Sequence, residues 1–213
     1  QEYVESSAIR PGNRVLRADR QKLNRKGASG DIEFEVASKG FGLVFKHMLG
    51  ASAITTPAGG TTARDHTATL ADPWGTNLTI QVGRPDVSGT VQPFTYTGCK
   101  ITEWELTSEL DDVLTLKTTI DANDEVPTSP ALATASYPAA DELLYFDGGS
   151  VTIGGAAADV TKFSLSGSNG LKTDRTFLRS STLKKEPIAA EFADISGEME
   201  MEFENLTAYN RFT

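Results

Sequence analysis

Glutamate occupies every second position of the segment 198–204, and Met199, Met201 and Phe203 occupy the positions between. A period of two is that of a β-strand, in which successive side chains point to opposite faces of the sheet. The segments 31–36 (DIEFEV) and 101–106 (ITEWEL) repeat the pattern. These three segments predict a sheet with one face of carboxylates and one face of apolar side chains.

The predicted carboxylate face has a high energetic cost. Glutamate is a poor strand former, and like charges on neighbouring strands repel each other. An acidic face kept for solubility is one interpretation, and a surface that repels a polyanion such as DNA is the other. The carboxylates on this predicted face are Asp31, Glu33, Glu35, Glu103, Glu105, Glu198, Glu200, Glu202 and Glu204.

The rest of the chain predicts a mainly β fold, an antiparallel β-sandwich or partly rolled barrel with one short flanking helix. Apolar residues at helical spacing, followed by Gly50, predict that helix over 38–49. Residues 51–64, rich in Thr, Ala and Gly, predict a long loop, and residues 124–140 a Pro- and Ala-rich connection. Further strands are expected at 68–70, 78–82, 91–97, 100–107, 113–120, 150–153, 160–166 and 195–204.

Charge divides the chain into a basic arm, residues 1–30, and one acidic domain, residues 31–213. The arm holds seven basic and three acidic residues, which gives it a net charge of +4 in a chain whose net charge is −9. A solvated terminus would account for this, and so would an arm that rests on the acidic surface of a neighbouring subunit in a head-to-tail assembly. The candidate contact residues are Arg10, Arg14, Arg17, Arg20, Lys22, Arg25 and Lys26.

Catalytic chemistry finds little support in this sequence. The chain has two histidines and one cysteine, Cys99, and it lacks the spacings of a zinc site, a nucleophile elbow or a phosphate-binding loop. We therefore predict no enzyme activity, no cofactor and no metal. No apolar run is long enough to span a bilayer, so no membrane association is expected.

A sugar-binding β-sandwich is the alternative from a different functional class. Tryptophan is the side chain that such a module would use, and the chain has Trp74 and Trp104. Trp104 falls on the apolar side of its strand, which predicts core packing. Trp74 lies in a predicted turn, where it could be exposed or packed.

Residues 28–50 resemble the strand-then-helix signature of major tail proteins, the tube subunits of long-tailed bacteriophages. Residues 97–106 and 111–122 are similar to the central strand pair of that family. The resemblance implies hexameric rings stacked into a tube, with the carboxylates facing a lumen through which DNA passes without specific binding. The tube protein of a contractile or type VI injection system is the nearest alternative.

The resemblance also implies partners and a location. The partners would be copies of the same chain together with the tape measure, terminator and distal tail proteins. The location would be the tail of the virion, after assembly in the host cytoplasm. Because the chain begins at Gln1 and ends just after a predicted strand, we expect the gene product to be longer.

Overall fold

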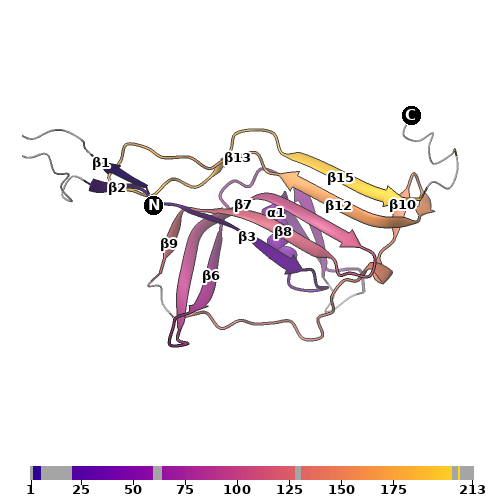
Figure 1. Ribbon diagram of the computed structural model, residues 1–213. Coiled ribbons are helices and arrows are strands. Elements are labelled where there is room, and N and C mark those ends of the chain that lie inside the picture. Colours follow the sequence, from indigo (N-terminus) through magenta and orange to yellow (C-terminus); the bar gives the residue numbers. More distant parts are fainter. Residues whose placement is uncertain (1, 6–20, 60–63, 128–130, 203–205, 207–213) are drawn as a thin grey trace, which may run out of the picture.

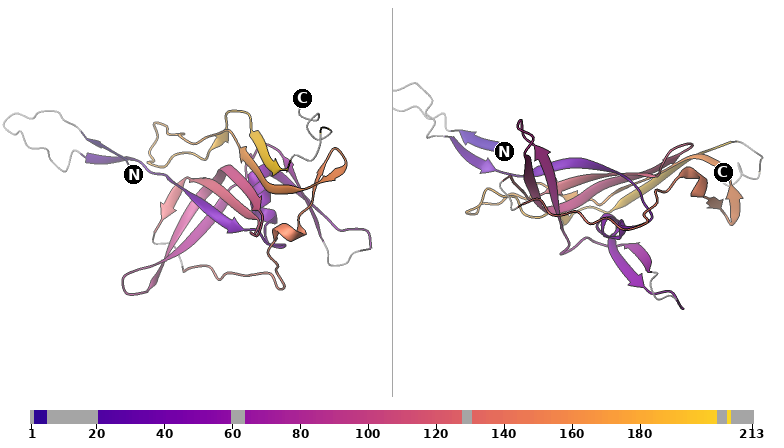
Figure 2. Two further views of the ribbon diagram at one scale, coloured as in Figure 1. Left: turned by 45° about the vertical axis from the view of Figure 1, so that its right-hand side comes forward. Right: turned by 90° about the horizontal axis from the view of Figure 1, so that it is seen from below.

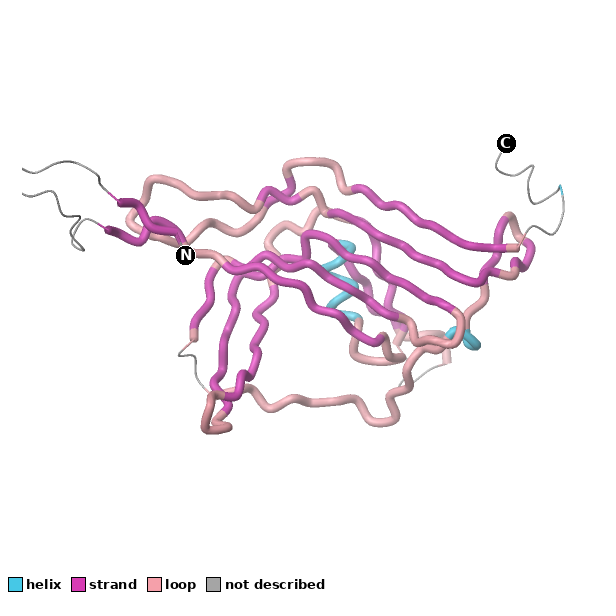
Figure 3. Tube along the Cα trace, viewed as in Figure 1, coloured by secondary structure: helices cyan, strands magenta, loops and turns pink. Residues whose placement is uncertain are grey.

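The computed structural model describes residues 2–5, 21–59, 64–127, 131–202 and 206 (Figure 1). Antiparallel strands dominate, and a short helix flanks them, which confirms the predicted fold class (Figure 3). The elements are β1 (Glu2–Glu5), β2 (Gln21–Arg25), β3 (Ala28–Glu35), α1 (Gly42–Leu49), β4 (Gly50–Thr55), β5 (Asp65–Leu70), β6 (Leu78–Pro85), β7 (Val91–Glu109), β8 (Thr115–Ala122), β9 (Asp124–Val126), η2 (Phe146–Gly148, a 3-10 helix), β10 (Val151–Ile153), β11 (Ala156–Ala158), β12 (Val160–Ser168), β13 (Leu171–Lys172), β14 (Ile188–Ala189) and β15 (Asp194–Met201).

The main sheet has the strand order β15-β12-β7-β8-β3. Only the second half of β7 belongs to this order, because its first half pairs with β6 and β9 instead. Gly98 lies between the two halves with a φ of 62°, a conformation that glycine adopts without steric cost. The sequence predicts two strands here, 91–97 and 100–107, and the structure joins them into one bent strand of 19 residues (Figure 1).

The core lies between the apolar face of the main sheet and α1, which covers one side of that sheet (Figure 2). Trp104 is only 4% exposed, which confirms the predicted core position. Its indole lies directly over Gly167 of β12, where an added Cβ atom would be 2.4 Å from the ring. The buried apolar residues of this core are Val36, Met48, Cys99, Ile101, Trp104, Leu116, Ile120 and Ala122.

Helix α1 begins later and ends where the sequence predicts. Residues 38 and 39 precede the helix, and their backbone amides bond to the connection before β10: the Ser38 N–H to the Glu142 carbonyl oxygen and the Lys39 N–H to Asp141 Oδ1. Gly50 ends the helix with a φ of 100°, and an added Cβ atom there would be 1.8 Å from the Ala71 carbonyl oxygen. Gly50 is thus required both by its backbone conformation and by the lack of space.

The prediction of a loop over residues 51–64 is wrong for the first part of that range. Residues 50–55 form β4, and all six pair with β5 in an antiparallel hairpin. Small side chains fill β4, so the alternation of apolar residues that reveals a strand is missing from its sequence. The predicted connection 124–140 likewise begins with a short strand, β9, which extends the β7 half-sheet.

At the N-terminal end, β1 and β2 form a two-stranded antiparallel ribbon that leads into β3 (Figures 1 and 2). The Arg25 guanidinium forms an ion pair with the Glu2 carboxylate across the ribbon. Beyond β2, the Lys26 N–H donates a 2.8 Å hydrogen bond to the Thr182 carbonyl oxygen. The base of the ribbon is therefore fastened to the segment between β13 and β14.

Candidate functional site

The cross-strand register of the main sheet brings the predicted carboxylates together on one face. Residues directly opposite each other in an antiparallel pair point to the same side of the sheet. Thr119 of β8 faces both Asp31 and Glu103, and Ser168 of β12 faces both Glu103 and Asp194. This row therefore runs across five strands on a single face, which we call the carboxylate face.

Apart from the buried residues Lys100 and Asp121, which the register also places on this side, the carboxylate face holds nine acidic side chains and two lysines within the five strands. The acidic residues are Asp31, Glu33 and Glu35 of β3, Glu103, Glu105 and Glu109 of β7, and Asp194, Glu198 and Glu200 of β15. The intervening strands contribute Thr115, Lys117 and Thr119 of β8, and Lys162, Ser164, Ser166 and Ser168 of β12. Of the other predicted members, Glu202 is exposed just beyond β15, and Glu204 lies outside the described residues.

The strand order separates like charges. The three acidic strands, β3, β7 and β15, never adjoin, because a strand of hydroxyls and lysine stands between each pair. Lys117 lies opposite both Glu33 and Glu105, and Thr119 Oγ1 donates a 2.8 Å hydrogen bond to Asp31 Oδ1. The repulsion expected between neighbouring acidic strands is thereby reduced, while the face as a whole remains strongly negative.

One end of the face contains an exposed ion pair. The Lys162 ammonium pairs with the Glu109 carboxylate opposite, and Glu200 lies on the other side of Lys162. The hydrogen bond and the charge of Glu109 raise the pKa of Lys162, with smaller contributions from Glu200 and Glu105. Lys162 therefore stays charged at neutral pH and neutralises one carboxylate of the face.

A shallow depression of about 300 Å³ lies in the middle of the carboxylate face. Strand β12 forms its floor, because Ser166 and Ser168 have small side chains and Gly167 has none. Glu103 and Glu105 stand along one side and Asp194 along the other, and Lys117 is the basic residue in the lining. The hollow is thus negative, which opposes the binding of phosphate groups.

Cys99 and His47 are not on this face. Cys99 is fully buried in the core, and burial raises its thiol pKa to about 11, so the thiol is protonated at neutral pH. His47 is buried on α1, where burial and the charges of Lys46 and Lys100 lower its pKa. Within the described ranges, no three His, Cys, Asp or Glu side chains are placed to hold a metal ion. No helix in those ranges is long and apolar enough to cross a membrane.

The predicted basic contact residues that the structure describes lie outside the five strands of the carboxylate face. Lys22, Arg25 and Lys26 belong to β2 and its junction with β3, where Lys22 and Arg25 are exposed. Arg10, Arg14, Arg17 and Arg20 lie outside the described residues.

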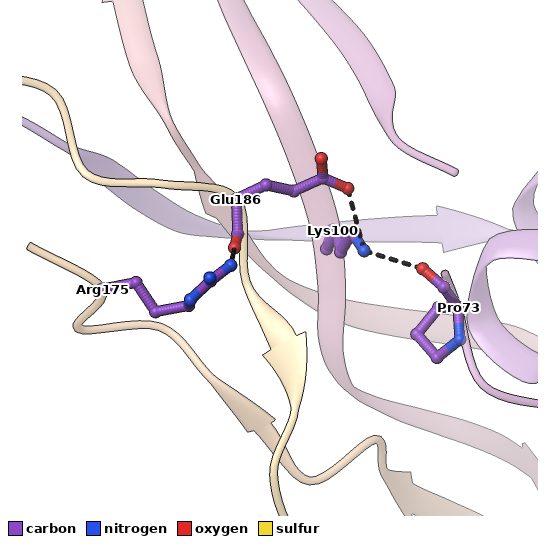
Figure 4. Close-up of polar contacts among 4 residues, drawn as sticks. All are labelled: Pro73, Lys100, Arg175 and Glu186. Atoms are coloured by element: carbon purple, nitrogen blue, oxygen red, sulfur yellow. Dashed lines mark hydrogen bonds and ion pairs between the residues drawn. The ribbon is translucent and has the colours of Figure 1, made fainter. Parts of the chain in front are cut away.

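Sequence reasoning missed a group of buried charges where β7 enters the main sheet. Lys100 is buried, and its Nζ atom lies 2.9 Å from Glu186 Oε1 and donates a 2.7 Å hydrogen bond to the Pro73 carbonyl oxygen (Figure 4). On β8, the buried Asp121 pairs with Lys184. A lysine between Cys99 and Ile101 in a strand was the available signal, because a buried lysine requires a partner.

Comparison with known protein families gives a match for this chain. The family described as "Phage tail tube protein" matches residues 1–213, the whole chain. The chain belongs to the phage tail tube protein family. The resemblance inferred from residues 28–50, 97–106 and 111–122 is thereby confirmed.

A phage tail tube protein is a structural subunit of the virion tail, which is built from many subunits. Comparison with curated proteins finds no match to this tail tube protein. Trp74, the residue that left a sugar-binding role open, is exposed in the turn between β5 and β6, away from the carboxylate face. In a tail tube protein, the carboxylate face is the surface whose chemistry most needs a functional explanation.

Proposed function

We propose that the carboxylate face lines the lumen of a tube made of stacked hexameric rings, through which DNA passes without specific binding. The observation that supports this is the charge of the face: nine carboxylates and two lysines, on a sheet whose other face packs against the core. Phosphate binding depends on lysine and arginine, so a wall of carboxylates keeps DNA from adhering as it slides.

The edges of the main sheet support lateral assembly. Among the described strands, β3 and β15 each have a partner on one side only, so the backbone groups of their outer edges are free to pair. Such edges invite pairing with another chain. We propose that β15 of one subunit adjoins β3 of the next, which would continue the carboxylate face around a closed ring. The tape measure, terminator and distal tail proteins would bind the ends of the resulting tube.

Negative-stain electron microscopy of the full chain over a concentration series tests the assembly. We expect rings, and at higher concentrations hollow tubes of uniform width. Dispersed monomers at every concentration would contradict the proposal.

The lumen assignment is tested separately with a double charge reversal, Glu103→Lys with Glu198→Lys. We expect tubes of this variant to retain short duplex DNA at low salt, whereas wild-type tubes do not. Asp72→Lys with Asp159→Lys is the matched control, since it makes the same change in net charge at exposed positions off the five strands. Equal DNA retention by both variants would mean that total charge, and not the carboxylate face, controls adhesion.

A further inference from the structure

The segment 173–187, which connects β13 to β14, is a long loop that we call the strap. Its base is fixed to the sheet by the ion pairs Lys184–Asp121 and Lys100–Glu186. Arg175 Nη1 donates a 2.5 Å hydrogen bond to the Glu186 carbonyl oxygen, which joins the two arms of the strap (Figure 4). The Lys185 N–H also donates a 2.8 Å hydrogen bond to the Arg175 carbonyl oxygen. The strap thus holds its shape without a hydrophobic core of its own.

The strap exposes apolar side chains that have basic side chains beside them. Leu178 is fully exposed, and half of Phe177 is exposed. The Arg175 guanidinium carbon lies 5.7 Å from the centre of the Phe177 ring, and Lys185 Nζ lies 5.3 Å from it. Fully exposed apolar side chains on an ordered loop are typical of an interaction site.

The opposite end of the main sheet carries the complementary combination. Leu110, in the turn between β7 and β8, is exposed beside Asp111 and Asp112. The Phe146 N–H bonds to the Asp112 carbonyl oxygen at 3.3 Å, which places the exposed Tyr145 and Phe146 and the neighbouring Asp147 beside this turn. We call this group, residues 110–112 and 145–147, the acidic end.

The strap and the acidic end lie at opposite ends of the same strand. The strap is anchored at Lys100, and the acidic end follows directly after Glu109, the last residue of β7. Ten residues of strand at roughly 3.3 Å each separate the two by about 30 Å. The two surfaces therefore cannot meet within one chain, but they can meet between two chains arranged head to tail.

We infer that the strap of one copy docks on the acidic end of the next copy, with Phe177 and Leu178 against Leu110 and Tyr145. The inference rests on the proposed tube, for which it names the contact between successive rings. A second copy is the occupant because each surface complements the other in charge and in apolar content. A contact between two different surfaces at opposite ends of the subunit, repeated from copy to copy without closing into a ring, extends along an axis, as a tube requires.

The test for the contact is cross-linking between two single-cysteine variants, Leu178→Cys and Leu110→Cys, mixed and treated with a short bismaleimide. Cys99 stays silent because it is buried and its thiol pKa is raised to about 11. We expect a cross-linked dimer in the mixture, at least tenfold above a mixture of Leu178→Cys with Val87→Cys. Val87 is equally exposed, in the turn between β6 and β7, and serves as the collision control.

A second measurement uses Leu178→Asp, which leaves the fold intact because Leu178 is fully exposed. We expect the concentration needed for tube formation to rise at least tenfold, and Val87→Asp to leave it unchanged. Tubes without the cross-link, or an unchanged critical concentration for Leu178→Asp, would overturn the docking contact and leave the tube proposal standing. A cross-link without tubes would support the contact and refute the tube, and the absence of both would refute both.

Discussion

Charge is handled in opposite ways on the carboxylate face and at the base of the strap. On the face, nine carboxylates are spread over exposed positions, and Lys162–Glu109 is the ion pair among the described residues there. At the base of the strap, Lys100 and Asp121 of the sheet and Lys184 of the strap are largely withdrawn from water, and each has a partner of opposite charge. Exposed charges contribute little to folding, whereas a buried charge that loses its partner is costly.

The contrast separates charges that hold the fold from charges that serve its surface. The strap depends on its ion pairs because it lacks a core, and so its charges should be sensitive to single substitutions. The carboxylate face should be tolerant, since water solvates each of its groups and a hydroxyl or lysine separates the acidic strands. Five measurements can break or sharpen this division.

Lys184→Met should have the largest effect. The substitution leaves the Asp121 carboxylate, whose side chain is 9% exposed, without its ion-pair partner. We expect the free energy of unfolding at neutral pH to fall by about 3 kcal/mol. Urea denaturation measures this, and adding Asp121→Asn to the variant should restore much of the loss. A loss below about 1 kcal/mol would mean that the strap does not depend on this pair.

The loss in Lys184→Met should also depend on pH. Burial raises the pKa of Asp121, and Lys184 opposes that rise, so in the variant the pKa should be higher still. The deficit is then fully present above this raised pKa, where the carboxylate is charged. It shrinks as the pH falls through that value, because a protonated carboxyl needs no cation. A deficit that grew on acidification would contradict the assignment.

Gly167→Ala should have an intermediate effect on stability. Gly167 packs against the core residue Trp104, and its neighbours in β12, Ser166 and Ser168, lie on the carboxylate face. The new methyl group would lie 2.4 Å from the Trp104 ring, so the indole must shift. We expect a loss of about 1–3 kcal/mol, typical of overpacking in a core. Tryptophan fluorescence should report a changed environment, and Gly30→Ala on β3, where an added methyl meets nothing within 4 Å, is the matched control.

Glu103→Gln with Glu105→Gln should change stability by no more than about 0.5 kcal/mol, and in the stabilising direction. The substitution removes two like charges from the carboxylate face and keeps the size of both side chains. Thermal or urea unfolding can measure the difference. A loss above about 1 kcal/mol would place these glutamates among the charges that hold the fold.

Salt should give the smallest effect. Raising sodium chloride from about 0.01 M to about 1 M shortens the Debye length from about 30 Å to about 3 Å, which screens repulsion across the carboxylate face. We expect wild-type stability to rise by a few tenths of a kcal/mol, and by less in Glu103→Gln with Glu105→Gln. An equal rise in both proteins would exclude the face as its source.

Seven of the nine carboxylates were predicted from the sequence, because the period of two fixes which side chains share a face of one strand, whereas Glu109 and Asp194 were missed. The strand order was not predictable, so the separating role of Lys117 and Ser166 could not be foreseen. Gly50 marked the end of α1 correctly, since its signal is local. The hairpin strand β4 was missed because its partner β5 lies beyond a long connection and its own side chains lack alternation.

The buried ion pairs were out of reach for a different reason. Lys100 and Glu186 are far apart in sequence, and their pairing depends on where the strap returns to the sheet. The same holds for Asp121, whose position on β8 alone gives no indication that Lys184 will cover it. Local patterns thus predicted elements and faces, while contacts between distant segments required the structure.

The single strand β7 has a mechanical consequence. It runs unbroken through both half-sheets, paired with β6 and β9 along its first part and with β8 and β12 along its second. Tension along this strand would load both ladders of hydrogen bonds in shear, so many bonds would share the force and have to break together. A subunit built this way should yield as one unit under load, a useful property in a tube that must stay intact while it is bent and pulled.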